Sequence, residues 1–215
     1  MKARRRPAAR KATRPARRSP SAPASRSRAP KPPDTGAEVA RLSGLIAGER
    51  DPARGLEHLL TVARRVTGAE AGTVYLRRGE MLEFAVVQND VLARRLGADE
   101  VRKRLAARPL SLRETSIASY VVLTRATVNL KDAYAIPMDR PYTLFRQVDA
   151  KADYKTRSML ATPLRDAQGR VFGVLQLINA LDRHKQVGAF SKEHQALVQA
   201  LAALAAHIPS PVATS

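Results

Sequence analysis

"RSMLATPLRDAQGRVFGVLQLINALD", residues 157–182, indicates the fold of this chain more directly than any other segment. Two apolar runs flank a polar turn, DAQG, and this pattern predicts a β-hairpin with Gly169 as the left-handed residue. A strand with one buried face alternates apolar and polar residues, whereas here apolar residues occupy successive positions. Both faces of this strand pair must therefore be covered. The sequence leaves open whether the second cover is a packed core or the wall of a ligand pocket.

The neighbouring segments supply further strands and helices for the same sheet. Two strands are expected at 72–76 and 81–88, joined through RRGE with Gly79 as the turn residue. A short helix from about Thr35 ends at Gly48, and a second helix begins at Asp51–Pro52 and ends at Gly68. Ser191 caps a last helix. Hairpin-joined strands with helices at both ends indicate an α+β domain with an antiparallel sheet.

The middle of the chain is left to cover the second face of that sheet. A helix is expected at 116–124, capped by Thr115 or Ser116, and a short strand at 126–130. Residues 90–112 show helical and irregular features together. The helices at the two ends of the domain can cover one face, so residues 90–153 remain for the other. This segment is long, broken and partly polar, and we therefore expect it to enclose a cavity.

Composition excludes several classes of function. The chain has no cysteine, which excludes disulfides, thiolate zinc sites and thiol catalysis. No catalytic motif is present, and the four histidines have no second ligand at metal-binding spacing. We therefore expect no enzyme activity, no metal and no cofactor. The sequence has no apolar run of membrane-spanning length and no secretory signal, so a cytoplasmic location is expected.

Residues 1–34 differ in composition from the rest of the chain. They contain twelve Lys or Arg, one acidic residue, Asp34, and seven prolines, but no Val, Ile, Leu, Phe or Tyr. Such a segment is predicted to be disordered because it cannot bury enough apolar surface. It is either a polyanion-binding arm or a solvated extension. The candidate nucleic-acid-binding residues are Arg4, Arg5, Arg6, Arg10, Lys11, Arg14, Arg17 and Arg18.

Three stretches together resemble the GAF domains of phosphodiesterases and bacterial signalling enzymes. They are SIASYVVLTRATVNLKDAYAIP, VDAKADYKTRSMLATPLRDAQGRVFGVLQLINALD and AFSKEHQALVQAL. The resemblance covers about residues 38–208 and implies a six-stranded antiparallel sheet, with terminal helices on one face and a capped ligand pocket on the other. We accordingly divide the chain into a basic tail (1–34), a GAF domain (35–208) and a C-terminal tail (209–215).

The resemblance also implies candidate ligand-binding residues. In relatives that bind cyclic nucleotides, the helix beginning near Ser116 directs backbone amides at the ligand phosphate, as helix N-termini can do in general. Residues at the other matching positions border the pocket in those relatives. The full set of candidates is Ser116, Ile117, Ala118, Asp132, Tyr134, Asp149, Thr156 and Gln176.

The sequence also departs from the cyclic-nucleotide-binding pattern. Asn179 and Phe190 match the family signature, but Ala180 replaces its lysine, and His194 and Gln195 replace its acidic pair. The lysine–aspartate salt bridge of that signature therefore cannot form, which disfavours cyclic AMP and cyclic GMP as ligands.

Two functions remain compatible with these observations. The first is a stand-alone sensory or regulatory module that binds a small molecule, with nucleotide-like ligands among the candidates, and signals through dimerisation or a partner enzyme. The second is a nucleic-acid-associated protein that uses the basic tail as an anchor and the GAF domain as a dimer scaffold. Alanines on the last helix, which allow close helix packing, favour a homodimer.

Overall fold

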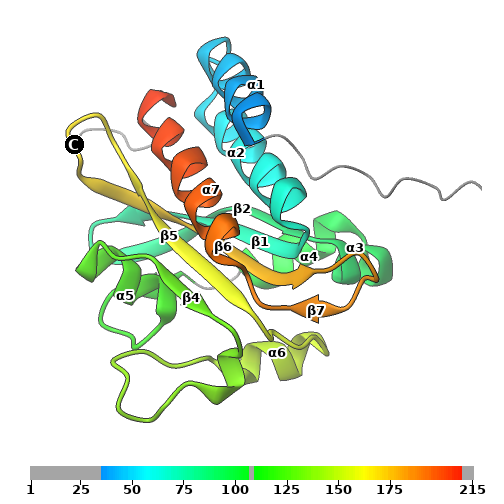
Figure 1. Cartoon of the computed structure of the whole chain (residues 1–215). Helices are drawn as coiled ribbons and strands as arrows, with labels where there is room; N and C mark the ends of the chain where they lie inside the picture. The colour runs from blue at the N-terminus through cyan, green and yellow to red at the C-terminus, as the bar shows by residue number, and fades with distance from the viewer. Residues whose placement is uncertain (1–34, 107–108, 210–215) are drawn as a thin grey trace, which may run out of the picture. The chain divides into compact units, whose positions relative to one another are not determined.

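The computed structural model describes residues 35–106 and 109–209. The basic tail of residues 1–34, with all its candidate nucleic-acid-binding residues, therefore lies outside the described residues, as do residues 210–215. The described residues form seven α-helices and seven strands, and Figure 1 shows how these elements are arranged. In chain order the described elements are α1 (Thr35–Ala47), α2 (Pro52–Thr67), β1 (Ala69–Arg78), β2 (Met81–Asn89), α3 (Asp90–Leu96), α4 (Ala98–Ala106), β3 (Leu110–Ser111), α5 (Ile117–Thr124), β4 (Val128–Leu130), the 3₁₀ turn η1 (Ala133–Ala135), α6 (Arg146–Ala152), β5 (Met159–Arg165), β6 (Val171–Leu181), β7 (Val187–Gly188), α7 (Lys192–Ala203) and the 3₁₀ turn η2 (Leu204–His207).

The described strands form one antiparallel sheet in the order β3-β2-β1-β6-β5-β4, and β7 pairs with β6 outside this path. The expected six-stranded antiparallel GAF sheet is confirmed. The hairpin of the opening stretch becomes β5 and β6 near the centre of the sheet, with Gly169 at φ 76° in the turn. Gly79 between β1 and β2 is also left-handed, at φ 58°.

Local capping sets the ends of the helices as the sequence predicts. Asp51 accepts a hydrogen bond from the Ala53 amide at 2.9 Å, and Gly68 ends α2 in the left-handed conformation at φ 66°. Ser116 caps α5 and Ser191 caps α7. The ambiguous residues 90–112 form the short helices α3 and α4 and the edge strand β3, with 107–108 outside the described residues.

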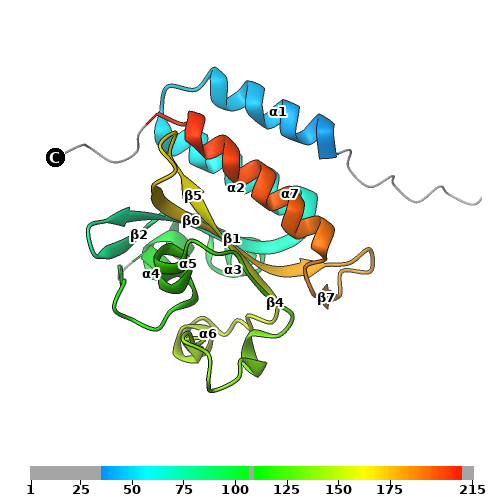
Figure 2. The ribbon, with the colours of Figure 1, turned by 60° about the vertical axis from the view of Figure 1, so that its left-hand side comes forward.

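Helices α1, α2 and α7 lie together over one face of the sheet (Figure 2). Alternate residues of β6 point to this face, so Leu175 and Leu177 pack under Leu59, Leu60 and the other apolar side chains of the helices. All four of these leucines are fully buried. This helix layer holds the larger of the two apolar cores of the domain.

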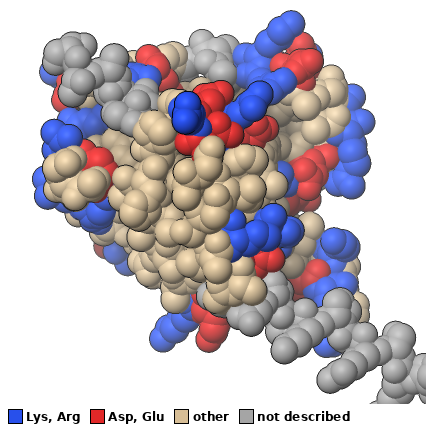
Figure 3. Space-filling model, turned by 90° about the horizontal axis from the view of Figure 1, so that it is seen from above, with Lys and Arg blue, Asp and Glu red and all other residues tan. Residues whose placement is uncertain are grey.

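The outer surface of the helix layer is largely uncharged. Figure 3 looks down on this layer, and most charged side chains there surround a broad area of uncharged residues. The exposed side chains of α1 and α7 include small ones at Ala37, Ala40, Ala196 and Ala200 and a larger one at Leu45. Among the residues that the structure describes, no helix is both long enough and apolar enough to cross a membrane.

The second face of the sheet carries α3, α4, α5 and α6 with their connecting segments (Figure 2). The sequence assigned this cover to residues 90–153, and the structure agrees. Helix α6 and the short β7 are additions that the sequence analysis did not contain. We call the α5 part of this face the roof and the part around η1 and α6 the Tyr134 end.

Candidate functional site

The N-terminus of α5 is capped from within the protein. Ser116 Oγ accepts a hydrogen bond from the Ser119 amide at 3.0 Å and lies 2.7 Å from Ser119 Oγ. Ser119 Oγ donates in turn to the carbonyl of Ser111 at 3.1 Å. Thr143 forms a bridge with Ser116, and the Thr143 amide donates to the Thr115 carbonyl at 2.7 Å. The candidates Ser116, Ile117 and Ala118 are all buried in this arrangement.

Apolar side chains fill the space beneath the roof. Val121 and Val122 of α5 pack on Ala161 and Val174 of the central strands. Further apolar residues from both sides, among them Tyr75, Leu82, Leu112, Tyr142 and Met159, complete the cluster. The sequence led us to expect a cavity here. Leu112 and Tyr142, from connecting segments distant in sequence, contribute side chains to this space.

Gln176 lies on the roof side of β6, as expected from its position between Val174 and Ile178. It is buried, and its neighbours across the sheet are Thr73 on β1 and Ala161 on β5. The hydroxyl of Tyr75 has its pKa raised by burial, while its contacts with Thr73 and Gln176 act in the opposite direction. Gln176 is therefore part of a buried polar group beside the apolar cluster.

Three other candidate residues meet in one hydrogen-bonded knot at the Tyr134 end. Asp149 Oδ2 accepts from the Tyr134 hydroxyl at 2.9 Å and from the Thr156 amide at 2.7 Å, and Asp149 Oδ1 accepts from Thr156 Oγ1 at 2.8 Å. Asp149 is 6 % exposed and Thr156 4 %. Three donors thus compensate the burial of one carboxylate. We call Tyr134, Asp149 and Thr156 the Asp149 knot.

Tyr134 is held on several sides. Asp132 Oδ1 accepts from the Tyr134 amide at 2.8 Å, so Asp132 caps η1. The Arg146 guanidinium lies 4.9 Å and the Lys155 ammonium 5.1 Å from the centre of the Tyr134 ring, which is the range of cation–π contacts. The pKa of the Tyr134 hydroxyl is raised, first because the hydrogen bond to Asp149 favours the protonated form and second because of desolvation.

A second polar cluster joins the segment before β5 to the centre of the sheet. Tyr154 donates its hydroxyl hydrogen to Glu70 Oε2 at 2.7 Å, and Asn179 Nδ2 lies 2.9 Å from the same carboxylate oxygen. Asn179 Nδ2 also donates to the Lys155 carbonyl, and Asn179 Oδ1 accepts from the Arg157 amide. Burial and the Glu70 carboxylate raise the pKa of Tyr154. Asn179 adopts a left-handed backbone at φ 58°, which asparagine tolerates better than most residues.

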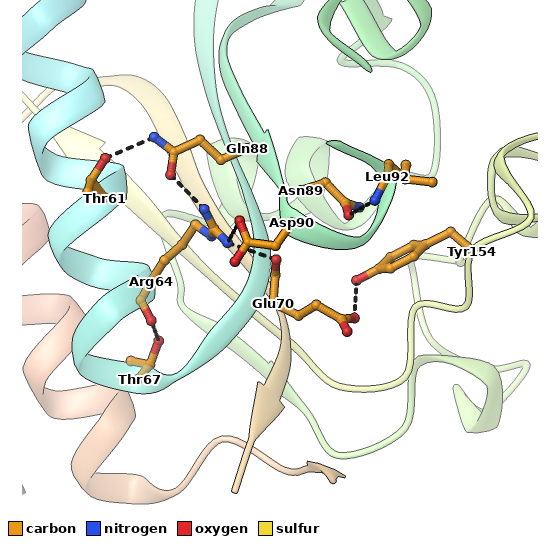
Figure 4. Close-up of polar contacts among 9 residues, drawn as sticks. All are labelled: Thr61, Arg64, Thr67, Glu70, Gln88, Asn89, Asp90, Leu92 and Tyr154. Atoms are coloured by element: carbon orange, nitrogen blue, oxygen red, sulfur yellow. Dashed lines mark hydrogen bonds and ion pairs between the residues drawn. The ribbon is translucent and has the colours of Figure 1, made fainter. Parts of the chain in front are cut away.

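Arg64 connects this cluster to the helix layer, as Figure 4 shows. Its guanidinium donates to the Glu70 carbonyl at 2.8 Å and to Gln88 Oε1 at 2.9 Å, and it pairs with Asp90 at 2.7 Å. The Arg64 side chain is only 12 % exposed. Helix α2, strands β1 and β2 and the first turn of α3 therefore meet at one partly buried cation.

Two cavities lie at the Tyr134 end, and Tyr134 and Lys155 line both of them. The smaller has a volume of about 300 Å³ and is lined by Lys131, Asp132, Tyr134, Lys155, Arg157, Val187, Gly188 and Ala189. The larger, about 480 Å³, is shallower and is lined by Tyr134, Arg146, Asp149, Ala150, Asp153, Tyr154 and Lys155. Within the described residues, neither of these cavities is lined by Ser116, Ile117, Ala118 or Gln176.

The structure thus separates the sequence candidates into two groups. Asp132, Tyr134 and Asp149 border cavities, and Thr156 supports them, whereas Ser116, Ile117, Ala118 and Gln176 belong to the packed roof. The sequence analysis missed Lys131, Lys155 and Arg157, because separated basic residues look like ordinary solvated surface. One pattern in the sequence could have indicated these cations. Residues 155–157 alternate Lys-Thr-Arg, which places two cations on the side opposite a buried threonine.

Near the start of α7, at the positions of the cyclic-nucleotide-binding signature, the structure has a hydrogen-bonded contact in place of the family's salt bridge. Asn129 Nδ2 donates to Gln195 Oε1 at 3.1 Å and to the Phe190 carbonyl at 3.3 Å. Ala180, at the position of the family lysine, is buried. A neutral amide pair here joins α7 to β4.

The sequence profile of the GAF domain family matches residues 51–208. The cGMP-specific 3′,5′-cyclic phosphodiesterase of Drosophila virilis is 28% identical over 148 residues, which are 68% of this chain and 16% of that protein. The enzyme of the same name from Drosophila melanogaster is 27% identical over 148 residues, again 68% of this chain and 13% of that protein. The chain therefore spans less than a fifth of the length of these relatives.

Solved structures show the same fold at lower identity. A GAF domain from a phosphoenolpyruvate-protein phosphotransferase of Coxiella burnetii superimposes with a TM-score of 0.59 at 16% identity, covering 80% of this chain and 91% of that one. A free methionine-R-sulfoxide reductase from Neisseria meningitidis gives a TM-score of 0.55 at 19% identity, covering 80% and 86%. Because the family match spans more than half of the sequence and the sheet has the expected order, the chain belongs to the GAF domain family.

Proposed function

We propose that this chain is a non-enzymatic regulatory module that binds a small molecule at the Tyr134 end of its sheet. The observation that carries this proposal is the position of Tyr134, which borders both cavities while its hydroxyl donates to the buried Asp149. A ligand that enters either cavity contacts the side chain on which the Asp149 knot depends. One structural neighbour is named as a sulfoxide reductase. We leave this activity out of the proposal because we associate that branch of the family with cysteine thiols, and this chain has no cysteine.

The proposed signal travels from this end to the helix layer. The Asp149 knot holds Thr156, and the adjacent Tyr154 contacts the Glu70 carboxylate. The backbone of Glu70 is in turn bound by Arg64 on α2. A ligand that shifts residues 154–157 therefore changes the hydrogen bonds that fix α2 against the sheet. Such a contiguous network supports coupling, and measured coupling energies are what establish it.

The helix layer is the proposed output surface. Its outer side is largely uncharged, and small exposed residues on α1 and α7 allow another helix to approach closely (Figure 3). We propose that a second copy of this chain or a signalling partner packs here. Light scattering coupled to size exclusion tests the homodimer: wild type should run as a dimer, and Ala200→Glu on exposed α7 should give a monomer. A monomeric wild type at all concentrations contradicts it.

A ligand screen tests binding at the Tyr134 end. The full chain is titrated with cyclic AMP, cyclic GMP, other nucleotides and central metabolites while its melting temperature is recorded. We expect at least one compound to raise the melting temperature. Tyr134→Ala should abolish that shift, while Tyr120→Ala, a matched tyrosine on α5 outside both cavities, should retain it. Each shift is measured against the variant's own melting temperature without compound.

Two outcomes contradict the proposal. One is that no compound in the panel stabilises the protein. The other is a stabilising compound whose effect survives Tyr134→Ala and disappears on Tyr120→Ala, which would place the ligand under the roof.

A second candidate function rests on the sequence of residues 1–34 alone, whose net charge of +11 suits a polyanion. Neutralising about 6–10 phosphates would lower DNA affinity by roughly 10³–10⁵ between 50 and 200 mM salt. Deletion of residues 1–34 should then abolish binding to a random-sequence duplex. An affinity that the deletion leaves unchanged excludes this function.

A further inference from the structure

We infer that the smaller cavity at the Tyr134 end is an anion site that takes a compact dianion, a phosphate monoester or a dicarboxylate. This inference rests on the proposed function, since it names the chemistry of the ligand at the Tyr134 end. It depends on three cations that the sequence analysis did not single out, Lys131, Lys155 and Arg157, and the cavity lies outside the roof.

The charge of the lining is the first argument. Three segments distant in sequence form the cavity: Lys131 to Tyr134, Lys155 to Arg157, and Val187 to Ala189. Three of the lining side chains are cationic, Lys131, Lys155 and Arg157, and one is anionic, Asp132. The lining thus carries a formal charge of +2, which is the complement of a dianion.

The second argument is that these cations have no carboxylate partner in the described part of the chain, although the Lys155 ammonium lies over the Tyr134 ring. Among the ion pairs of the described residues, none includes Lys131, Lys155 or Arg157. Asp132, the one carboxylate in the lining of this cavity, already accepts the Tyr134 amide hydrogen. Three like charges around one concavity repel each other, and a bound anion removes that repulsion.

The backbone around the cations is held firmly, which is the third argument. The Arg157 amide donates to Asn179 Oδ1 at 2.7 Å, and the Arg157 carbonyl accepts from the Ala133 amide at 2.6 Å. The Lys155 carbonyl accepts from Asn179 Nδ2 at 2.9 Å. Two of the cationic side chains therefore project from a segment that is fixed to β6 and η1, and ordering them around a ligand costs less entropy than on a free loop.

Size and ring contacts limit the ligand to a compact one. A volume of about 300 Å³ is at the lower end of the range for small-molecule pockets. Arg146 and Lys155 already lie over the Tyr134 ring, so a nucleobase could stack there only by displacing a cation. The guanidinium of Arg157 offers paired N–H donors to two oxygens of a phosphate or carboxylate, and the lysines add point charges.

Residue-resolved NMR titration of the full chain tests this site, because the amide shifts separate the cavity from the basic tail. The probes are inorganic phosphate, succinate and, as a neutral control, glycerol, at constant ionic strength. We expect saturable shifts at the amides of Lys131, Arg157 and Gly188 with phosphate, succinate or both, on the order of millimolar affinity, and none with glycerol. Which dianion saturates assigns the site to phosphate monoesters or to dicarboxylates.

Three variants give the sharpest readout. Arg157→Gln should weaken dianion binding about fivefold or more, while Arg50→Gln, an exposed arginine in the α1–α2 connection, should leave it unchanged. Asp132→Asn keeps a side-chain oxygen for the Tyr134 amide but removes the only negative charge of the lining. It should therefore tighten binding by about two- to fivefold, an increase that damage to the fold would not produce.

The inference is overturned if neither dianion shifts the cavity amides, or if Arg157→Gln leaves the affinity of both unchanged. A neutral compound that binds in a Tyr134-dependent way, together with no response to either dianion, would overturn this inference alone and leave the proposed function standing. An absence of any stabilising compound across the whole panel, together with no response to either dianion, would remove both.

Discussion

The face of the sheet under α1, α2 and α7 and the face that carries the Tyr134 end share the same strands but are held together differently. On the helix face, Leu59, Leu60, Leu175 and Leu177 are fully buried among other apolar side chains. At the Tyr134 end, the buried carboxylate of Asp149 is surrounded by hydrogen-bond donors. Apolar packing is non-directional, whereas each hydrogen bond depends on one partner in one orientation.

This difference indicates which face can respond to a ligand. A packed leucine core tolerates little rearrangement at low cost, because its stability is spread over many contacts. A polar cluster can exchange one donor for another when a ligand supplies it, and its residues keep the same charges. The roof combines the two, since apolar residues fill it beside the buried Gln176.

The largest expected effect comes from opening the helix face. Leu60 is fully buried, and its side chain lies directly over Gly72, where an added Cβ would meet it at 2.7 Å. Leu60→Ala should lower the free energy of unfolding by about 2–5 kcal/mol, as for other buried leucines. Leu123→Ala on α5, at a position 62% exposed, is the matched control and should change it by less than about 0.5 kcal/mol. Urea denaturation measures both. Equal effects would mean that the helix face does not hold the main core.

The second-largest loss of stability is expected from removing directional hydrogen bonds in place of non-directional apolar contacts. Asp149→Ala leaves the Tyr134 hydroxyl, the Thr156 amide and the Thr156 hydroxyl without their acceptor. We expect a loss of about 2–4 kcal/mol in the same measurement, because buried donors without partners carry their full desolvation cost. Asp139→Ala, in the exposed loop before α6, removes the same group and should have almost no effect. A loss of stability no larger than that of Asp139→Ala would show that the Asp149 knot contributes nothing to stability.

A smaller loss of stability is expected at Tyr154, where the second polar cluster meets the sheet. Tyr154→Phe removes the hydroxyl that contacts Glu70 and Asn179, both of which retain other hydrogen-bond partners or solvent. The expected loss is about 1 kcal/mol. Tyr120→Phe is the control at a tyrosine with a ring contact to Tyr142. If a stabilising ligand is found, Tyr154→Phe should also reduce its effect on the exchange of α2 amides, which separates a coupling role from simple loss of stability.

The same contrast explains what the sequence could predict. The strand pair at 157–182, the turn at Gly169 and the caps Asp51, Ser116 and Ser191 are local patterns, so periodicity and capping rules predict them. The family resemblance singled out Tyr134, Asp149 and Thr156, and the structure brings these three residues together in one hydrogen-bonded cluster. Their mutual hydrogen bonds could not be predicted, because spacing gives no side-chain directions.

The filling of the roof could not be predicted for a related reason. It depends on the summed volume of side chains from segments as distant as Leu82, Leu112, Tyr142 and Met159, which only the folded chain brings together. The cations of the smaller cavity share this origin, since Lys131 and Arg157 become neighbours only when β4 pairs with β5. Long-range placement of individually ordinary residues is the part that sequence reasoning missed.

The smallest expected effect concerns pH at the start of α7, where the helix face uses a directional contact. His194 is half-buried, and burial lowers its pKa. Its Nδ1 also accepts the Ser191 amide hydrogen at 3.5 Å, which requires the neutral imidazole. Because the folded pKa lies below the unfolded one, the unfolded state binds more protons, and stability falls as pH drops through the unfolded value near 6.5.

Between about pH 8 and about pH 6, carboxylates stay ionised, so histidines dominate the pH dependence of the denaturation midpoint. Wild type should lose under about 1 kcal/mol over this range, since His194 is partly solvated. His194→Gln keeps an acceptor at the third helical position and should flatten the curve. His207→Gln, at an exposed histidine, should leave the slope as it is in wild type. An unchanged slope in His194→Gln would mean that the neutral cap does not couple proton binding to folding.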